Sequence, residues 1–251
     1  MRTPFQGVWN IIRFNWPFYV LSLVVVLFIF LVRYNSSGWL TIAANILLFL
    51  IVASTIISLL VSWYVYDHSG FYELNWLDDT PAGESETIVN INAGFDETSA
   101  LLENRYKNAE LIVCDFYDPA KHTAASIARA RKAYPPFSKT QSVSTVQLPL
   151  KDASANKIFA ILSAHEIRSA DERNSFFSEL ARVLSPRGQI VVVEHLRDTA
   201  NYLAYNIGAF HFHKRADWLN AFSSAGLTSE REMKITPFLT AFFLKKNGTA
   251  P

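Results

Sequence analysis

Two long stretches near the start of the chain are almost wholly apolar. They span residues 16–34 and 39–66, and Arg33 is the one charged residue in them. At about 1.5 Å of rise per residue, a helix of either length crosses, or nearly crosses, a hydrocarbon core of roughly 30 Å. The pattern predicts two transmembrane helices joined by a short link. The alternatives are a buried pair of helices in a soluble protein and a cleaved signal peptide, whose apolar region would span only about 7–15 residues.

The charges around this hairpin indicate its orientation. Residues 1–66 contain Arg2, Arg13 and Arg33 and no acidic residue. Because two of these arginines lie at the N-terminal end, the positive-inside tendency places both ends of the hairpin in the cytoplasm. We therefore expect a two-pass integral membrane protein with both termini and the following domain on the cytoplasmic side.

Aromatic residues flank the predicted hairpin on both sides. Residues 4–14 have the pattern of a short amphipathic helix lying in the membrane interface, with a frayed terminus as the alternative. Beyond the hairpin, residues 67–86 are expected to form an interfacial linker. Its Tyr72 and Trp76 are typical membrane-surface anchors, and the alternative is that they lean over a ligand of the domain that follows.

From residue 87 onward, short runs rich in β-branched residues alternate with helical patterns. The expected strands are 87–92, 110–115, 143–148, 157–163 and 189–195, and the expected helices are 96–106, 119–134, 170–184 and 215–225. Several strands are apolar on both faces, as in a parallel sheet covered by helices. Residues 230–246 hold two strands with no room for a helix between them, so the last strand must run antiparallel. The pattern predicts an α/β domain over residues 87–251, with a doubly wound seven-stranded sheet of six parallel strands and one antiparallel strand.

Charge and cysteine content narrow the possible partners. Of the 23 basic residues, 20 lie beyond position 66, together with all 22 acidic residues. Such a surface is not expected to bind nucleic acid, since phosphate backbones require a basic face. The basic residues Arg129, Arg131 and Lys132 are expected on a solvated helix face, with lipid headgroups as the alternative partner. Cys114 is the only cysteine, which excludes an internal disulfide and suits a reducing compartment.

Three stretches of the domain carry a family resemblance. They are "IVNINAG" (88–94), "IVCD" (112–115) and "ELARVLSPRGQIVVVEH" (179–195), and their order and closing strand pair resemble the class I S-adenosylmethionine-dependent methyltransferases. The resemblance covers about residues 87–246 and implies S-adenosylmethionine as cofactor and S-adenosylhomocysteine as product. The hairpin is outside the common fold, so it indicates a membrane-anchored branch. A nicotinamide-binding domain is the competing interpretation, but it would require three spaced glycines after the first strand.

The resemblance also implies which residues hold the cofactor. Asn90 stands where the family has an acidic residue, and Asn92 where it has its first glycine, so that only Gly94 of the usual glycines remains. Asparagine tolerates a left-handed backbone, and Asn92 is therefore expected to make the turn. Asp115 is expected to accept the ribose hydroxyls, and Asp152 to meet the adenine. The alternatives are a turn-capping role for Asp115 and a solvated turn for Asp152.

Histidine and glutamate residues follow the fourth and fifth expected strands. His165 and Glu166 follow one strand, and His195 ends the next, so all should meet where ligands gather in doubly wound sheets. Methyl transfer to a hydroxyl needs alignment and removal of a proton, and histidine suits the second task. We expect His165 or His195 to be the base and Glu166 to orient an imidazole or the acceptor. Structural roles at strand ends are the alternative for each histidine.

The insert after the fifth strand, residues 198–218, is more apolar than a solvent loop requires. It is expected to form a lid over the acceptor pocket and to touch the bilayer. His211 and His213 lie two positions apart within it. No metal is expected, although a divalent metal site formed with His165, His195 and the two glutamates, Glu166 and Glu194, is the alternative.

The prediction from sequence is a methyltransferase tethered to the cytoplasmic face of a membrane. Its acceptor would be lipophilic, with a phenol- or quinol-type lipid first and a phospholipid or polyprenyl compound next. The alternative is a membrane-bound binding or assembly protein that has kept the fold and lost turnover. The single remaining glycine of the first loop favours this alternative, and the histidines and glutamates at two strand ends oppose it.

Overall fold

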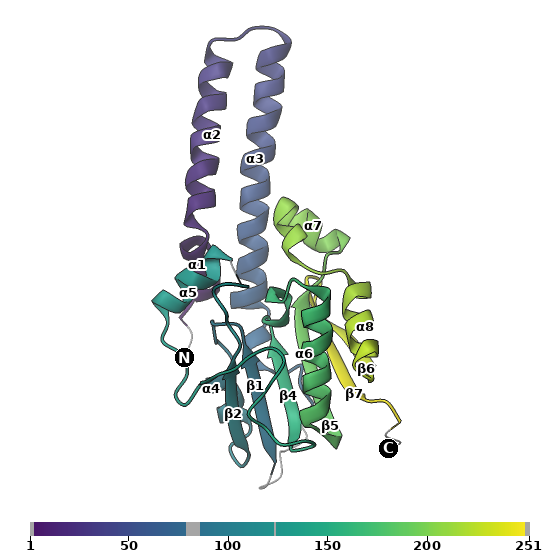
Figure 1. The fold of residues 1–251 in the computed structure, drawn as a ribbon. Coiled ribbons are helices and arrows are strands. Elements are labelled where there is room, and N and C mark those ends of the chain that lie inside the picture. The colour runs from purple at the N-terminus through teal and green to yellow at the C-terminus, as the bar shows by residue number, and fades with distance from the viewer. Residues whose placement is uncertain (1–2, 79–85, 123, 249–251) are drawn as a thin grey trace.

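A helical hairpin projects from one end of an α/β domain in the computed structural model of the protein (Figure 1). The structure describes residues 3–78, 86–122 and 124–248. Arg2, which contributes to the expected orientation, and residues 79–85 of the expected linker lie outside the described residues. The two ends of the hairpin meet the domain, and its tip lies farthest from the domain.

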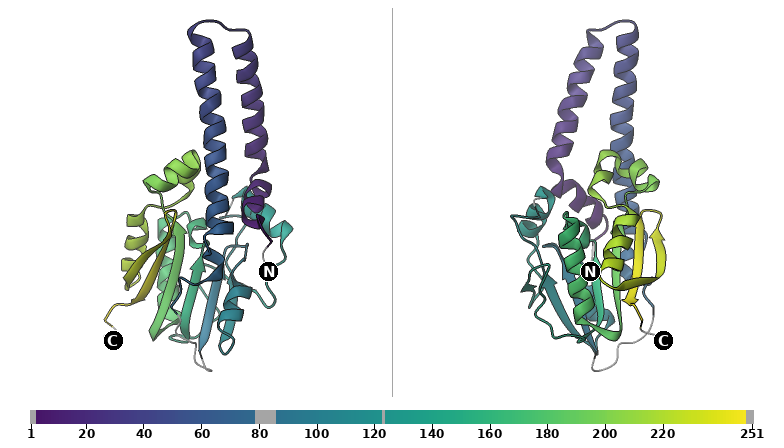
Figure 2. Two further views of the ribbon diagram at one scale, coloured as in Figure 1. Left: turned by 180° about the vertical axis from the view of Figure 1, so that it is seen from behind. Right: turned by 45° about the vertical axis from the view of Figure 1, so that its right-hand side comes forward.

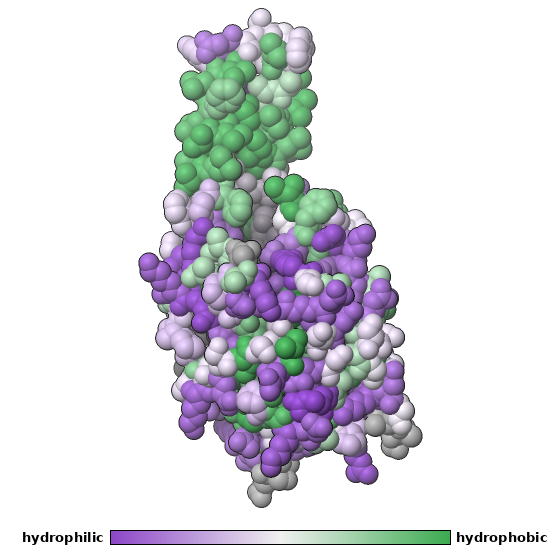
Figure 3. All heavy atoms as spheres, in the orientation of Figure 1, coloured by the Kyte–Doolittle hydropathy of each residue, from purple (hydrophilic) through white to green (hydrophobic). Residues whose placement is uncertain are grey.

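The hairpin consists of α2 (Trp16–Tyr34) and α3 (Trp39–Trp63). The two helices run side by side in every view (Figure 2), and their outer surface is apolar along most of its length (Figure 3). Both helices are strongly apolar, with a mean hydropathy above 2 over their most apolar stretch. Only 6% of that stretch is buried inside the protein in either helix. The protein itself therefore does not cover these side chains, unlike those of a core helix in a soluble domain.

A shorter helix, α1 (Gln6–Phe14), precedes the hairpin and packs against the domain. Phe14, expected near a membrane surface, is instead buried against Phe95 and Tyr134. Trp9 remains exposed on the opposite side of the helix. The amphipathic pattern is thus confirmed, but its buried face meets protein. Gly7 permits this packing, because a Cβ at that position would lie 2.4 Å from the Cβ of Tyr66.

The sheet has the predicted seven strands. They are β1 (Thr87–Asn92), β2 (Glu110–Asp115), β3 (Gln141–Ser142), β4 (Ala155–Ile161), β5 (Leu184–His195), β6 (Leu227–Thr236) and β7 (Leu239–Lys246). Their spatial order is β3-β2-β1-β4-β5-β7-β6, and β7 pairs antiparallel with both neighbours. The other pairs are parallel, so the prediction of six parallel strands and an antiparallel last strand is confirmed.

Helices and turns cover both faces of the sheet. They are η1 (Tyr64–His68), η2 (Phe71–Glu73), α4 (Ser99–Arg105), α5 (Ala125–Ala133), η3 (Ala164–Glu166), α6 (Ala170–Val183), α7 (Thr199–Tyr205), η4 (Asn206–His211) and α8 (Arg215–Ser224). The aromatic side chains of α6 and α8 fill the core on one face. On the other face, Phe71, Leu74 and Leu77 pack with Leu102 of α4 against the sheet. These three residues of the expected interfacial linker are therefore part of the domain core.

The structure differs most from the prediction at β3 and α5. The third strand was expected at 143–148, but β3 pairs with β2 only at Gln141 and Ser142. The chain then turns back on itself, since Ser144 bridges to Gln147 and Val146 is 55% exposed. Helix α5 begins at Ala125 because residues 118–122 form a separate turn, in which the Asp118 carbonyl accepts the His122 N–H at 2.7 Å.

Candidate active site

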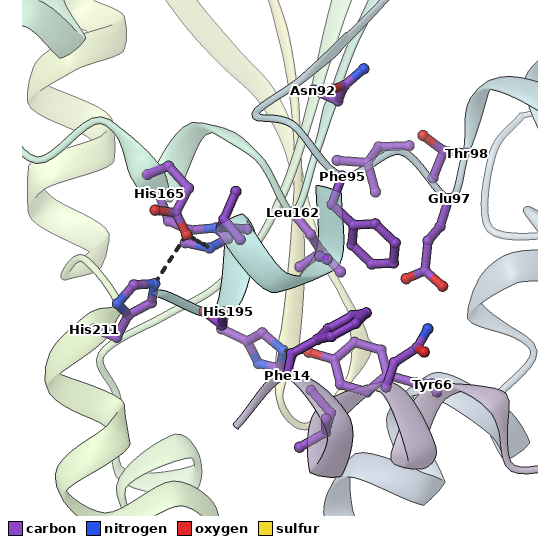
Figure 4. A pocket seen from close by; sticks show the side chains of 18 of the residues that line it. Phe14, Tyr66, Asn92, Phe95, Glu97, Thr98, Leu162, His165, His195 and His211 are labelled. Atoms are coloured by element: carbon purple, nitrogen blue, oxygen red, sulfur yellow. Dashed lines mark hydrogen bonds and ion pairs between the residues drawn. The ribbon is translucent and has the colours of Figure 1, made fainter. Parts of the chain in front are cut away.

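A cavity of about 190 Å³ lies at the carboxyl ends of β1, β4 and β5. The sheet side contributes Asn92, His165 and His195, while α1 and α5 close the opposite side. Figure 4 shows Tyr66 and Phe14 on the side of His195, and Asn92 beyond Phe95. The strand ends therefore bring the predicted histidines to the same cavity as the first loop, as expected for a doubly wound sheet.

The loop after β1 is held by the side chain of Asn92. Its Oδ1 accepts the N–H of Gly94 at 3.0 Å. Gly94 has φ +94, and a Cβ there would lie 2.8 Å from atoms of Arg131. The left-handed residue is thus the glycine, and the expectation that Asn92 makes the turn with its own backbone is wrong. Asn92 instead fixes the loop through its side chain.

Several buried polar atoms beside this loop have no protein partner. They are Asn90 Oδ1, Asn92 Nδ2 and Asp96 Oδ2. The other atoms of these side chains are engaged: Asn90 Nδ2 donates to Ser99 Oγ at 2.8 Å, and Asp96 Oδ1 accepts the Ser99 N–H at 2.9 Å. Buried polar groups without a partner are costly. Two acceptors and one donor therefore remain for a ligand that carries an ammonium group and a carboxylate.

Asp115 ends β2 and is buried. Its Oδ1 accepts the Tyr117 N–H at 2.9 Å, and its Oδ2 is paired with Arg131 of α5. Arg129 of the same helix donates to the carbonyl of Phe14. The expectation of a solvated face is therefore wrong for Arg129, which is half-buried and binds α1. Arg131 is exposed as expected, although it also binds the expected ribose carboxylate.

Asp152 lies elsewhere. It is in the turn that enters β4, at the amino ends of the strands, and its side chain is 79% exposed and paired with Arg182. The cavity is at the carboxyl ends of the strands. Asp152 is therefore not brought to the site, and its expected contact with adenine has no support in its position.

His165 lies between two buried glutamates. Its Nδ1 is 2.7 Å from Glu194 Oε2, and its Nε2 is 3.3 Å from Glu166 Oε1. Burial disfavours a charged imidazole, but the two carboxylates outweigh burial and raise the pKa of His165 well above its ordinary value. The pKa of Glu166 is lowered: its own burial opposes this, and hydrogen bonds from His165 and His211 outweigh it. His165 is thus protonated near neutral pH and is a poor proton acceptor.

His195 has the opposite environment. Its Nδ1 is 3.0 Å from Asn201 Oδ1, and its Nε2 is 2.8 Å from the Tyr66 hydroxyl. The Asn201 amide nitrogen already donates to Asp198 and to the Phe238 carbonyl, so its oxygen faces the histidine as an acceptor. Nδ1 therefore carries the proton, and Nε2 offers a lone pair to the cavity. Burial lowers the pKa of His195 to about 4, so the ring is neutral.

Some site residues could not be found from sequence. Tyr66 is at the end of an apolar stretch that reads only as a membrane helix, and Asn201 is in the insert after β5. Tyr72, expected as a membrane anchor, donates its hydroxyl to Glu97 Oε2 at 2.7 Å and lines the cavity. The alternative of leaning over a ligand site thus fits its position. Helix α1 closes the site, and the amphipathic pattern of residues 4–14 was its one signal in the sequence.

Comparisons with known proteins agree with this fold. Residues 89–192 match the model of a methyltransferase domain family. A geranyl diphosphate methyltransferase in complex with S-adenosylmethionine superposes with a TM-score of 0.53 at 12% identity, covering 76% of this chain and 90% of that one. The geranyl diphosphate C-methyltransferase of Streptomyces coelicolor A3(2), in complex with Mg2+, geranyl diphosphate and S-adenosylhomocysteine, gives 0.50 at 12% identity, covering 71% and 78%.

A search of curated proteins by sequence found no match. One of these two structures has S-adenosylhomocysteine bound and the other S-adenosylmethionine. Together with the antiparallel β7 and the matched segment, they lead to one conclusion. The domain formed by residues 87–246 has the fold of the class I S-adenosylmethionine-dependent methyltransferases.

Proposed function

We propose that the protein is an S-adenosylmethionine-dependent methyltransferase, held on the cytoplasmic face of a membrane by α2 and α3, that methylates a hydroxyl of a lipophilic acceptor. The observation that carries the proposal is the contact between Tyr66 and His195. Tyr66 belongs to the π-helical turn η1 that continues the apolar helix α3, and His195 ends β5 beside the cofactor loop. One hydrogen bond thus links the membrane helix to the site of chemistry.

The residues beside the first loop fit the methionine part of the cofactor. Asn90 and Asp96 offer acceptor atoms to its ammonium group, and Asn92 offers a donor to its carboxylate. Asp115 is the ribose acceptor, once Arg131 turns away from it. When bound, S-adenosylmethionine supplies an electrophilic methyl group on a sulfonium sulfur.

His195 removes the proton of the acceptor. Of the two histidines expected from sequence, His165 is already protonated between glutamates, whereas His195 is neutral with Nε2 toward the cavity. The Asn201 contact keeps the proton on Nδ1 and orients the ring. An acceptor hydroxyl that takes the place of the Tyr66 hydroxyl would then give its proton to Nε2, while the bound cofactor would supply the methyl group and leave as S-adenosylhomocysteine.

Exposed apolar residues support a membrane-facing entrance. Leu203 of α7 is 71% exposed, and Ile207 and Phe210 of η4 are 85% and 60% exposed. Helix α7 contacts α3 and η4, and an apolar patch lies at α7 next to the hairpin (Figures 1 and 3). Such a patch is typical of a surface that touches lipid. A greasy acceptor can then enter from the bilayer without crossing water.

The test uses the full chain in detergent. Calorimetric titration with S-adenosylhomocysteine is expected to show binding, and labelled S-adenosylmethionine mixed with a membrane lipid extract is expected to transfer label to a lipid fraction. Absence of binding would overturn the proposal. Binding without transfer to any fraction would favour the second candidate.

That second candidate is a membrane-bound binding protein without turnover. Two observations favour it: Arg131 occupies the expected ribose carboxylate, and the cavity of about 190 Å³ is below the roughly 300–1,000 Å³ of ordinary ligand sites. Movement of α1 and α5 away from each other would release Asp115 from Arg131 and enlarge the cavity. The buried polar atoms without partners and the oriented His195 are more easily explained by the enzyme.

A further inference from the structure

Three potential metal ligands meet on one side of the cavity. They are His165 and Glu166 of η3 and His211 at the end of η4, and their donor atoms all lie within 4.8 Å of one another. Glu166 Oε1 is 3.3 Å from His165 Nε2 and 3.4 Å from His211 Nε2. Figure 4 shows His165 and His211 beside each other, and their ring centroids are 5.2 Å apart.

These separations suit a small transition-metal ion. Zinc binds imidazole nitrogen and carboxylate oxygen at about 2.0–2.2 Å, so neighbouring ligand atoms of a tetrahedral site lie roughly 3.3–3.5 Å apart. Both distances to Glu166 agree with this spacing. The third pair, between the two imidazoles, needs only an inward shift of His211, whose side chain is 38% exposed.

A fourth residue orients the first ligand. Glu194 is completely buried, and it accepts both the backbone N–H of His165 and the Nδ1 proton. This contact turns Nε2 toward Glu166 and His211, and Nε2 must lose its proton when a metal ion binds there. Histidines that bind metals usually donate their other nitrogen to a carboxylate in this way. The cluster therefore has an oriented ligand as well as three donors.

Charge also favours a cation at this position. Two buried carboxylates, Glu166 and Glu194, lie within 3.3 Å of one imidazole. In the present structure Arg168 supplies part of the balancing charge, with Nη2 2.7 Å from His211 Nε2. Arg168 thus occupies the side of His211 that an ion would use, and its long side chain can swing out toward solvent.

We propose that His165, Glu166 and His211 bind one divalent transition-metal ion, of which Zn2+ fits the ligands best, with Glu194 as positioning residue and Arg168 as competitor. Two imidazoles and one carboxylate form a three-ligand set of the kind that leaves a coordination position open. Because all three ligands line the cavity, that position faces the acceptor. Resting on the function proposed above, the ion would select acceptors that carry an oxygen donor beside the hydroxyl to be methylated.

The experiment measures Zn2+ binding directly. The full chain in detergent is stripped with a chelator, dialysed, and titrated with ZnCl2 by calorimetry, with bound zinc counted by elemental analysis. One equivalent is expected. His211→Ala should weaken binding at least ~10-fold, and Glu194→Gln ~10- to 100-fold. His68→Ala is the matched control, because His68 is an exposed histidine outside the cluster, and it should leave binding unchanged.

Arg168→Gln gives the sharpest test, since removing the competing cation should tighten Zn2+ binding several-fold. A protein in which the cluster is only a structural ion-pair network would show no such gain. Less than one equivalent of zinc in the wild type, or equal affinity in the wild type and His211→Ala, overturns the proposal. Titration of each sample with S-adenosylhomocysteine separates this failure from failure of the proposed function, and also reports that the variants are folded.

Discussion

The hydroxyl oxygen of Tyr66 lies 2.8 Å from Nε2 of His195, although 129 positions separate the two residues in the chain. Tyr66 reaches this position because the last turn of the apolar helix widens into a π-helix, η1. Such turns are frequent at functional sites. Since His195 must be the acceptor in this bond, the phenol stabilises the neutral ring that can accept a proton.

Replacing Tyr66 by phenylalanine should weaken that stabilisation. At neutral pH we expect little loss in the rate of methyl transfer, because His195 stays neutral there and the acceptor hydroxyl takes the place of the phenol at Nε2. The acid limb of the pH profile should nevertheless move to higher pH, because a neutral imidazole without its donor is protonated more easily. Tyr64→Phe is the control, because Tyr64 is in the same π-helical turn as Tyr66 but packs its ring against Phe238. A lower rate with an unmoved limb would mean that Tyr66 only packs.

The pH profile of the wild-type protein follows from the burial of His195. Burial lowers its pKa to about 4, whereas an unperturbed histidine titrates near 6.5. The groups that face it are His165, Asp198, Tyr66 and Tyr205. Because the neutral ring is the active form, activity should persist as the pH falls below 6.5 and should be lost only near pH 4.

His195→Gln provides the companion measurement. The rate should fall by about 10²- to 10⁴-fold, the usual contribution of a general base, while S-adenosylhomocysteine still binds. An acid limb at pH 6.5 in the wild type, or a small effect of this substitution, would assign the proton transfer to another group.

Asp115 and Asp152 form a matched pair for testing the cofactor site. Asp115 is buried at the carboxyl end of β2, whereas Asp152 is exposed near the amino end of β4. We expect Asp115→Ala to weaken S-adenosylhomocysteine binding ~10- to 100-fold, because a charged acceptor of ribose hydroxyls is lost. Asp152→Ala should have no effect. Calorimetry on both variants measures this, and equal affinities would remove Asp115 from the site.

The sheet could largely be predicted from the sequence, because buried parallel strands read as short apolar runs. Strands β1, β2 and β4 therefore begin and end near their expected residues, and β5 ends at His195 as expected but begins at Leu184 rather than at 189. Strand β3 could not be located in this way, since an edge strand with two paired residues has no apolar pattern of its own.

Less of the candidate site could be predicted from the sequence. The ends of β4 and β5 bring His165 and His195 to one cavity, as predicted. The contacts that give the two histidines different protonation states come from residues distant in the sequence. Glu194 and Asn201 fix the two protonation states, and Arg131 covers Asp115 from α5. Hydrophobic periodicity also cannot tell whether an amphipathic helix such as α1 meets lipid or protein.

The N-terminus of α1 is held by the carboxylate of Asp67, which follows Tyr66 in η1. Asp67 Oδ1 and Oδ2 accept the N–H groups of Gly7 and Val8 at 2.7 and 2.9 Å. A negative charge at this end also favours the helix dipole. Because α1 closes a cavity smaller than ordinary ligand sites, it must move outward before a nucleoside can enter.

Asp67→Asn should therefore loosen α1 and speed cofactor entry. Loss of the charge and of one of the two hydrogen bonds is worth about 1 kcal/mol, which corresponds to roughly a 5-fold larger open population. We expect faster hydrogen exchange of the α1 amides and a similar increase in the association rate of S-adenosylhomocysteine, followed by stopped-flow tryptophan fluorescence. Asp78→Asn is the control, since Asp78 pairs with Arg231 on the surface. If exchange accelerates but the association rate does not change, α1 is a structural cover and the cofactor enters by another path.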